Sequence, residues 1–281
     1  MTAAAALTAA LLAAASSPEV GGGLAGLSAR LTVVPGADRS PLEAVREVEA
    51  ALARIALAAN PAPAAAAPHA AAAPLVNDLP VVEVPSPHPG RRLAVLLTGD
   101  GGWVGIDRAL AAAFSDAGVS VVGLDSLRYF WRRRTPEQTA RDVARILAHY
   151  RAAWERDEVI LVGYSRGADI VPIVAGRLPP EERARLVLVA MLGPGTFAEL
   201  EVHAVDLFTT RRRAGAIPIE DAVRALAGAV PVLCIHGADE HDSLCPHLLD
   251  LPWVKDVRRP GGHHFRGAYR ELAAQVLEAA R

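Results

Sequence analysis

The chain has 281 residues, a formal charge of −2 and two cysteines. This length fits one large domain with additional segments, and the near-neutral charge excludes a general attraction to nucleic acid or to an anionic membrane. Two cysteines are too few for a disulfide-dense scaffold but suffice for one bridge.

The first 78 residues carry little chemistry. Residues 1–17 are small and apolar, but no Lys or Arg precedes Arg30, so we expect an atypical or truncated signal segment, with an alanine-rich disordered tail as the alternative. Residues 41–59 have the three- and four-residue apolar spacing of a helix, and residues 60–74 form an Ala/Pro-rich linker. We therefore divide the chain into residues 1–17, 18–78 and 79–281.

From residue 79 onward, short apolar runs alternate with amphipathic segments. The apolar runs predict strands over residues 81–84, 93–98, 119–124, 158–162, 186–191 and 230–236, and we expect a last, short strand over residues 255–258. The periodic segments predict helices over residues 106–117, 135–154, 168–177 and 269–280. This alternation is typical of a mostly parallel sheet with helices on both faces. Residues 197–218 are the only irregular insertion, so we expect a minimal lid.

The sequence Gly-Tyr-Ser-Arg-Gly at residues 163–167 stands between a predicted strand and a predicted helix. This G-x-S-x-G pattern is typical of the nucleophile elbow of α/β-hydrolases. The flanking glycines remove Cβ atoms that would clash with neighbouring backbone, and the turn exposes the Ser165 hydroxyl above the sheet. We therefore predict an α/β-hydrolase fold with Ser165 as its nucleophile; the alternative is an ordinary glycine-containing loop.

A serine nucleophile needs a base, which in this fold follows the acid near the end of the chain. The sequence Gly-Gly-His-His-Phe at residues 261–265 stands at that place. Adjacent side chains project in different directions, so only one histidine can face Ser165. We predict His264, because it precedes an aromatic residue as the base does in hydrolases with a comparable ending, and keep His263 as the alternative.

The acid is expected in the loop after the strand at residues 230–236. Glu240 lies three residues after Gly237, the usual place of the acid, while Asp239 and Asp242 are alternatives. The acid accepts a hydrogen bond from the second ring nitrogen of the base and stabilises the imidazolium.

Two backbone N–H groups are needed to bind the oxyanion that forms during acyl transfer. The residue after the nucleophile, Arg166, supplies one of them. Asp100 is the positional match for the second, because it lies in the Gly-Asp-Gly-Gly loop at residues 99–102, directly after the first long apolar strand. A simple tight turn is the alternative interpretation of this loop.

Two further features are not part of a generic hydrolase. Residues 125–131, Asp-Ser-Leu-Arg-Tyr-Phe-Trp, run into three arginines, and could either hold a phosphate-containing headgroup or form a basic turn over packed aromatic side chains. Cys234 and Cys245 flank the acid loop and would close it by a disulfide in an oxidising compartment. Their spacing with nearby histidines matches no common zinc pattern, so no metal is predicted.

Four motifs together resemble the bacterial VirJ/AcvB virulence-protein family. They are Thr-Gly-Asp-Gly-Gly-Trp at residues 98–103, Leu-Asp-Ser-Leu-Arg-Tyr-Phe-Trp at 124–131, the elbow with its helix at 163–172, and Gly-Gly-His-His-Phe at 261–265. The resemblance covers residues 79–281. Arg166 departs from it, because an apolar residue is expected there in relatives.

The resemblance implies a periplasmic serine hydrolase that cleaves the ester of aminoacylated phosphatidylglycerol, of the lysyl or alanyl type, and that is linked to virulence and secretion. It implies Asp125, Arg128 and Trp103 as substrate contacts and no cofactor. Asp169 is the alternative to Asp125 as the partner of the substrate ammonium, and either carboxylate could instead be structural. The expected partners are the lipid headgroup, the membrane surface and secretion-system proteins, and not nucleic acid. A non-catalytic periplasmic binding or assembly factor and a general carboxylesterase are the alternatives.

Overall fold

The computed structural model describes residues 75–201 and 215–281. The predictions for residues 1–17, and for the helix and linker up to residue 74, lie outside the described residues. The chain divides into two compact units, Met1–Ala62 and Pro63–Arg281, and the second contains the fold described below.

A seven-stranded sheet in the order β1-β3-β2-β4-β5-β8-β9 forms the centre of this unit. Only the edge strand β1 is antiparallel to its neighbour; all other pairs are parallel. The strands are β1 (Val81–Val84), β2 (Arg92–Leu97), β3 (Ser120–Leu124), β4 (Glu158–Tyr164), β5 (Leu186–Leu192), β8 (Val232–Gly237) and β9 (Val254–Arg259). This order, with the elbow strand β4 in the middle, is that of the α/β-hydrolase fold, as the sequence predicts.

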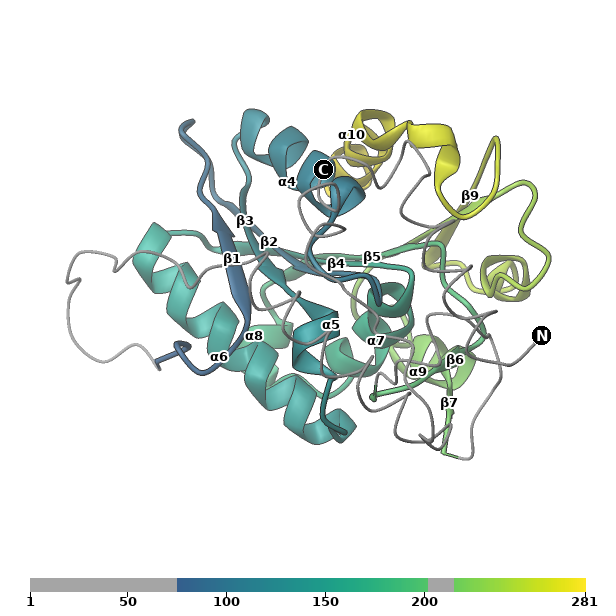
Figure 1. The fold of residues 1–281 in the computed structure, drawn as a ribbon, viewed down its shortest axis with the longest axis horizontal. Helices are drawn as coiled ribbons and strands as arrows, with labels where there is room; N and C mark the ends of the chain where they lie inside the picture. Colours follow the sequence, from purple (N-terminus) through teal and green to yellow (C-terminus); the bar gives the residue numbers. More distant parts are fainter. Residues whose placement is uncertain (1–74, 202–214) are drawn as a thin grey trace, which may run out of the picture. The chain divides into compact units, whose positions relative to one another are not determined.

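Helices cover both faces of the sheet (Figure 1). One face carries α4 (Gly105–Asp116) and α10 (Tyr269–Ala279). The other carries α5 (Ser126–Tyr129), α6 (Pro136–Trp154), α7 (Arg166–Ala175), α8 (Pro180–Arg183) and α9 (Ile219–Ala225). Helix α6 begins with a capping box: Thr135 Oγ1 accepts from Gln138 N–H at 3.1 Å, and the Gln138 side chain accepts from Thr135 N–H at 3.0 Å.

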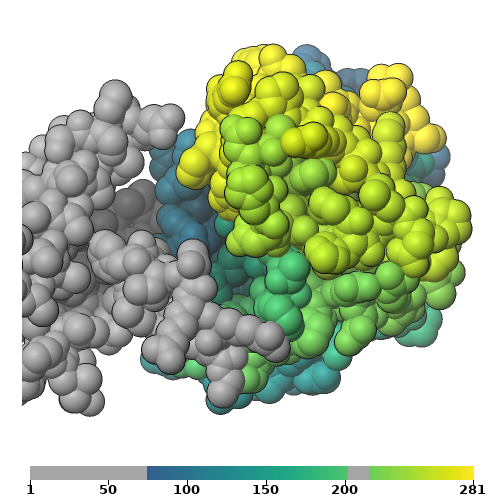
Figure 2. Space-filling view, turned by 90° about the vertical axis from the view of Figure 1, so that its right-hand side faces the viewer, coloured from purple at the N-terminus to yellow at the C-terminus, as the bar shows by residue number. Residues whose placement is uncertain are grey.

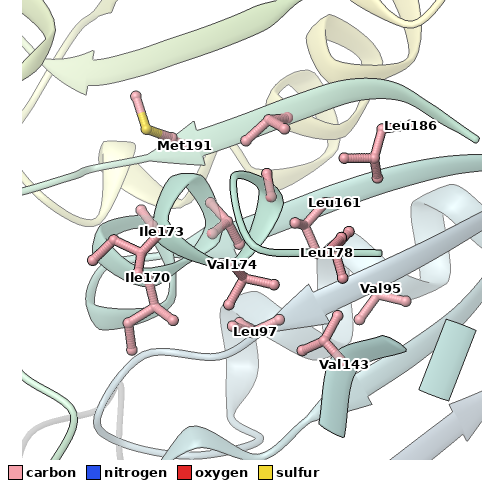
Figure 3. Packing of buried hydrophobic residues seen from close by; sticks show 14 of the residues in the cluster. Val95, Leu97, Val143, Leu161, Ile170, Ile173, Val174, Leu178, Leu186 and Met191 are labelled. Carbon is pink, nitrogen blue, oxygen red and sulfur yellow. The ribbon is translucent and has the colours of Figure 1, made fainter. Parts of the chain in front are cut away.

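The inner strands β2, β3, β4, β5 and β8 are mostly apolar because both of their faces are buried. The edge strands β1 and β9 are partly exposed, and β9 carries four charged side chains. Alternate side chains of β2 and β4, such as Leu97 and Leu161, point toward α6 and α7 and meet Val143 and Val174 there (Figure 3). The remaining strand side chains pack against α4 and α10. The central strands are thereby fixed from both sides, and the loops at their ends start from a rigid base.

Several short elements are not predicted by the sequence pattern. They are α5, α8, α9, the 3-10 helices η2 (Cys245–Leu248) and η3 (Phe265–Gly267), and a two-stranded antiparallel sheet of β6 (Phe197–Ala198) and β7 (Ile217–Pro218). The small sheet closes the base of the predicted insertion at residues 197–218, whose middle part lies outside the described residues.

Candidate active site

The site lies at the carboxyl edge of the sheet, where six parallel strands end. The loops after β2, β4, β5, β8 and β9 all leave the sheet at this edge, which is where ligands bind in open α/β sheets. Figure 2 shows the side of the unit formed by the later part of the chain, where the yellow C-terminal segments pack directly against green ones.

Ser165 stands on a sharp turn between β4 and α7. Its backbone has φ 53° and ψ −121°, a conformation that non-glycine residues rarely adopt. Two glycines allow the turn, since a Cβ on Gly163 would lie 2.2 Å from the Gly167 backbone, and one on Gly167 would lie 2.0 Å from the Leu97 carbonyl oxygen. The predicted elbow geometry is therefore confirmed.

His263 lies between Ser165 and Glu240. The Ser165 hydroxyl lies 2.8 Å from His263 Nε2, and His263 Nδ1 lies 2.6 Å from Glu240 Oε1. The prediction of His264 as the partner of Ser165 is wrong, because its Nδ1 instead lies 3.0 Å from the Tyr164 hydroxyl. The loop places the first histidine over the nucleophile, and left-handed backbone at Phe265 and Arg266 then turns the chain away.

Glu240 is the acid that the structure brings to the histidine, whereas Asp239 and Asp242 are exposed. The side chain of Glu240 is only 10% exposed, and its second oxygen accepts a hydrogen bond from Gly237 N–H. Burial opposes its charge, but the hydrogen bonds from His263 and Gly237 outweigh this effect and hold the pKa of the carboxyl below its usual value. Glu240 therefore carries a negative charge beside the imidazole at neutral pH.

The acid loop is held at several points. Cys234 and Cys245 form a disulfide across it. Ala238 and Asp239 donate backbone hydrogen bonds to the carbonyl groups of Arg259 and Gly261, at 2.7 and 3.0 Å. These bonds join the acid loop to the histidine loop, which we define as residues 261–267.

The glycine-rich loop after β2 lies against the nucleophile. A Cβ on Gly99 would lie 3.3 Å from the Ser165 Cβ, so the absence of a side chain lets the loop approach this closely. Asp100 follows at once, and within the described ranges its N–H has no backbone acceptor. Arg166 N–H begins α7 on the other side of the serine. The segments that carry these two N–H groups thus both lie next to Ser165, and their role as an oxyanion hole stays a prediction.

The buried carboxyl groups of Asp107 and Asp125 lie beside the glycine-rich loop and the residues that follow it. Asp107 is fully buried at the start of α4 and accepts from Val104 N–H at 3.3 Å. Burial raises the pKa of Asp107 to about 7. Asp125 accepts a hydrogen bond from Arg128 N–H at 3.1 Å and so caps α5. Its carboxylate lies close to the glycine-rich loop, since a Cβ added to Gly102 would be 2.9 Å from Asp125 Oδ1.

Comparison with known families connects this site to one of them. Residues 91–281, well over half of the chain, match the family described as bacterial virulence protein (VirJ). The chain belongs to the VirJ family. A comparison with curated proteins gives no match.

Several solved structures share part of the fold of this VirJ-family chain. Est1E from Butyrivibrio proteoclasticus with ferulic acid bound is 14% identical, with a TM-score of 0.48 over 71% of this chain and 93% of its own. An alpha-beta serine hydrolase homologue from Coxiella burnetii is 16% identical, with a TM-score of 0.49 over 70% and 89%. A thioesterase domain from the curacin biosynthetic pathway is 15% identical, with a TM-score of 0.48 over 70% and 94%. These likenesses are weak, so the fold assignment rests on the strand order and the family on the sequence match.

The predicted substrate contacts have different places in this VirJ-family structure. Trp103 is packed in the core, where a Cβ added to Gly123 would lie only 2.1 Å from its six-membered ring. Asp125 is a buried helix cap. Only Arg128 is partly exposed, and its guanidinium makes no ion pair within residues 75–201 and 215–281. The glycine in the middle of β3 was the sequence signal for the packed indole.

The aromatic residues after Asp125 stabilise the fold. Tyr129 and Phe130 are buried, the Tyr129 hydroxyl lies 2.7 Å from Asp142 Oδ2, and the Arg134 guanidinium lies 4.8 Å from the Tyr129 ring centre. Arg132 and Arg133 are exposed. The structure thus has the basic turn over packed aromatic side chains, and only the arginines are open to an anion.

Gly193 is a site residue that the sequence analysis did not assign, and Asp169 is the alternative to Asp125 for the substrate ammonium. Asp169, on the first turn of α7, accepts from Gly195 N–H at 2.8 Å, and burial raises its pKa well above the ordinary value. Gly193 follows β5 with φ 63°, and a Cβ there would lie 3.0 Å from His263 Cε1. The histidine therefore occupies space that only a glycine at position 193 leaves open.

The Arg166 side chain points away from the oxyanion position. Its Nη1 donates to the carbonyl oxygens of Glu199 and Glu201, at 2.9 and 3.3 Å, and so ties α7 to the segment after β6. Among the described residues, no group of three or more metal-binding side chains is gathered, and no helix there is long and apolar enough to cross a bilayer.

Proposed function

We propose that this VirJ-family protein is a serine hydrolase that cleaves the ester of aminoacylated phosphatidylglycerol in the bacterial periplasm. The observation that carries the proposal is the continuous hydrogen-bond chain from Ser165 through His263 to Glu240, on an elbow that exposes the serine. A serine hydroxyl becomes nucleophilic when an adjacent base takes its proton and an acid orients that base.

The reaction follows from these contacts. Ser165 Oγ attacks the ester carbonyl carbon while His263 Nε2 takes the hydroxyl proton. The N–H groups of Asp100 and Arg166 bind the oxyanion. The bond to the glycerol oxygen breaks, and the alcohol leaves with the proton from His263. Water then attacks the aminoacyl-serine ester, again with His263 as base, and releases the amino acid and the free serine.

The side chains of Asp169 and Arg128 favour an aminoacylated phospholipid as substrate. Burial disfavours the charge of Asp169 in the free protein, and an ammonium group bound beside it would favour the ionised carboxylate. Asp169 is partly buried near the nucleophile and has one carboxylate oxygen without a hydrogen-bond donor among the described residues. We assign the ammonium group of the aminoacyl unit to it, in place of Asp125, which is used as a cap. Arg128 and the exposed arginines beside it suit the lipid phosphate.

The disulfide between Cys234 and Cys245 supports an extracytoplasmic location, since such bonds persist in oxidising compartments such as the bacterial periplasm. Contact with the membrane surface, and with secretion-system proteins, follows from the resemblance to VirJ proteins and belongs to this proposal.

The test compares two ester substrates and two proteins. Wild-type protein and Ser165→Ala are incubated with lysyl- and alanyl-phosphatidylglycerol in mixed micelles and, separately, with p-nitrophenyl acetate, and the products are quantified by mass spectrometry and absorbance. We expect wild-type protein to release the amino acid and Ser165→Ala to release none. Turnover of the nitrophenyl ester alone would make the protein a general carboxylesterase, and no turnover of either ester would favour a binding factor.

A further inference from the structure

Tyr164 joins the nucleophile to the loop that carries its base. It directly precedes Ser165 at the end of β4 and is only 5% exposed. Its ring lies against the His263 ring, with 5.3 Å between the centroids and 34° between the planes. Of the two residues that must meet in the reaction, Ser165 thus follows Tyr164 directly in the chain, and His263 contacts its ring.

The Tyr164 hydroxyl reaches two groups of the histidine loop. It lies 3.0 Å from His264 Nδ1 and 3.4 Å from the His263 carbonyl oxygen. A phenol has one proton. Where His264 Nδ1 carries no proton, the hydroxyl donates either to this nitrogen or to the His263 carbonyl oxygen; where Nδ1 carries the proton, the hydroxyl accepts from it and donates to the carbonyl oxygen. Burial raises the pKa of Tyr164, so the hydroxyl stays protonated and remains a donor over the whole range in which the protein is folded.

The histidine loop needs such support, because it adopts an unfavourable backbone conformation. Phe265 and Arg266 have φ values of 50° and 52°, and a non-glycine residue in this region costs on the order of 1 kcal/mol. The buried Phe265 ring anchors the loop on one side. The Tyr164 hydroxyl holds the two residues before it, His263 and His264, over the elbow.

We propose that Tyr164 is a positioning residue for His263, acting through its hydroxyl, and that His264 is one of two interchangeable acceptors for that hydroxyl. The inference rests on the proposed serine mechanism. It explains why the loop has two adjacent histidines with different partners: the first contacts the nucleophile, and the second fixes the orientation of the first.

The test measures the rate constant for labelling of Ser165 by a fluorophosphonate probe, as a function of pH, in Tyr164→Phe. This variant keeps the ring and removes the hydroxyl. We expect the plateau of the rate constant to fall roughly tenfold, because a general base contributes about 10²- to 10⁴-fold and a misdirected ring loses part of this. Tyr150→Phe is the matched control. Tyr150 lies on α6, and its hydroxyl is 2.7 Å from Glu83 Oε1 on β1. Loss of this hydroxyl is expected to lower Tm without lowering the plateau.

A double-mutant cycle with His264→Ala tests the shared hydroxyl. His264→Ala alone is expected to lower the plateau by less than about threefold, because the hydroxyl then donates to the His263 carbonyl oxygen. Tyr164→Phe with His264→Ala should equal Tyr164→Phe alone, since both changes act through one hydrogen-bond donor. Additive losses, or a plateau in Tyr164→Phe that matches Tyr150→Phe, would overturn the inference. Labelling of Ser165→Ala would instead overturn the serine mechanism itself.

Discussion

The nucleophile elbow and the histidine loop are both turns with left-handed backbone, but they are held in different ways. In the elbow, added Cβ atoms on Gly163 and Gly167 would overlap backbone atoms at 2.2 and 2.0 Å. In the histidine loop, added Cβ atoms on Gly262 and Gly267 would meet nothing within 4 Å, and one on Gly261 would meet the Arg266 side chain at 2.6 Å and no backbone atom among its three nearest neighbours. The elbow is fixed by close backbone packing on the sheet, whereas the histidine loop depends on a small number of hydrogen bonds and one buried ring.

This difference separates stability from function. A change in the elbow disturbs the packing of β2, β4 and α7, and therefore the whole fold. A change around the histidine loop is expected to move His263 relative to Ser165 while the sheet stays intact. The predictions below use pairs of variants to separate these two effects.

The largest expected effect is that of Gly167→Ala in the elbow. The new methyl group would lie 2.0 Å from the Leu97 carbonyl oxygen, so β2 or α7 must shift, at more than about 4 kcal/mol of unfolding free energy. We expect little or no soluble, folded protein by circular dichroism. Gly262→Ala is the control in the histidine loop and should fold with an unchanged Tm. Equal stability of the two variants would contradict the contrast drawn here.

Removal of the disulfide should have the next largest effect. Cys234 and Cys245 are 11 residues apart, and opening a loop of this size costs about 3 kcal/mol of unfolding free energy. We expect Cys234→Ser with Cys245→Ser to lower Tm by several degrees and to increase proteolysis within the acid loop. Chemical denaturation of the oxidised and reduced wild-type protein provides the comparison, and equal midpoints would show that the bridge does not stabilise the fold.

Gly193→Ala should affect the reaction more than the fold. The methyl group would lie 3.0 Å from His263 Cε1 and 3.1 Å from its Nδ1, so the imidazole must move away from Ser165. We expect kcat to fall roughly 10- to 100-fold. The control is Gly195→Ala, whose methyl group would lie at an ordinary 3.7 Å from Asp169 Oδ1. Similar kcat values for both variants would argue against a tightly enclosed His263.

The same contrast explains what the sequence could predict. The sheet strands follow from continuous apolar runs, and the elbow follows from glycines whose backbone neighbours are close in sequence or in adjacent strands. The choice between His263 and His264 depends on the left-handed backbone conformation of Phe265 and Arg266. Neither residue type predicts this conformation. Asp125 was assigned to substrate from the family resemblance, whereas in the structure it caps the short helix α5. An Asp is a common helix cap, but the sequence pattern did not predict this short helix.

The smallest expected effect concerns acid sensitivity of the histidine loop. The folded-state pKa of Glu240 is lowered, so the stability that it contributes is present above its unfolded pKa and is lost as pH falls through the folded pKa. Below about pH 4.5 we expect histidine-loop amides to exchange faster relative to elbow amides. Glu240→Gln, which cannot titrate, should show no such pH-dependent ratio. A ratio that stays constant in wild-type protein would exclude this role for Glu240.

The most direct test of the account compares the two adjacent histidines. The second-order rate constant for fluorophosphonate labelling of Ser165 is measured in wild-type protein, His263→Ala and His264→Ala, each shown to be folded by circular dichroism. We predict a loss of at least about 10²-fold for His263→Ala, because the nucleophile loses its base, and a change of less than about threefold for His264→Ala. Loss of labelling in His264→Ala with retention in His263→Ala would contradict the catalytic assignment.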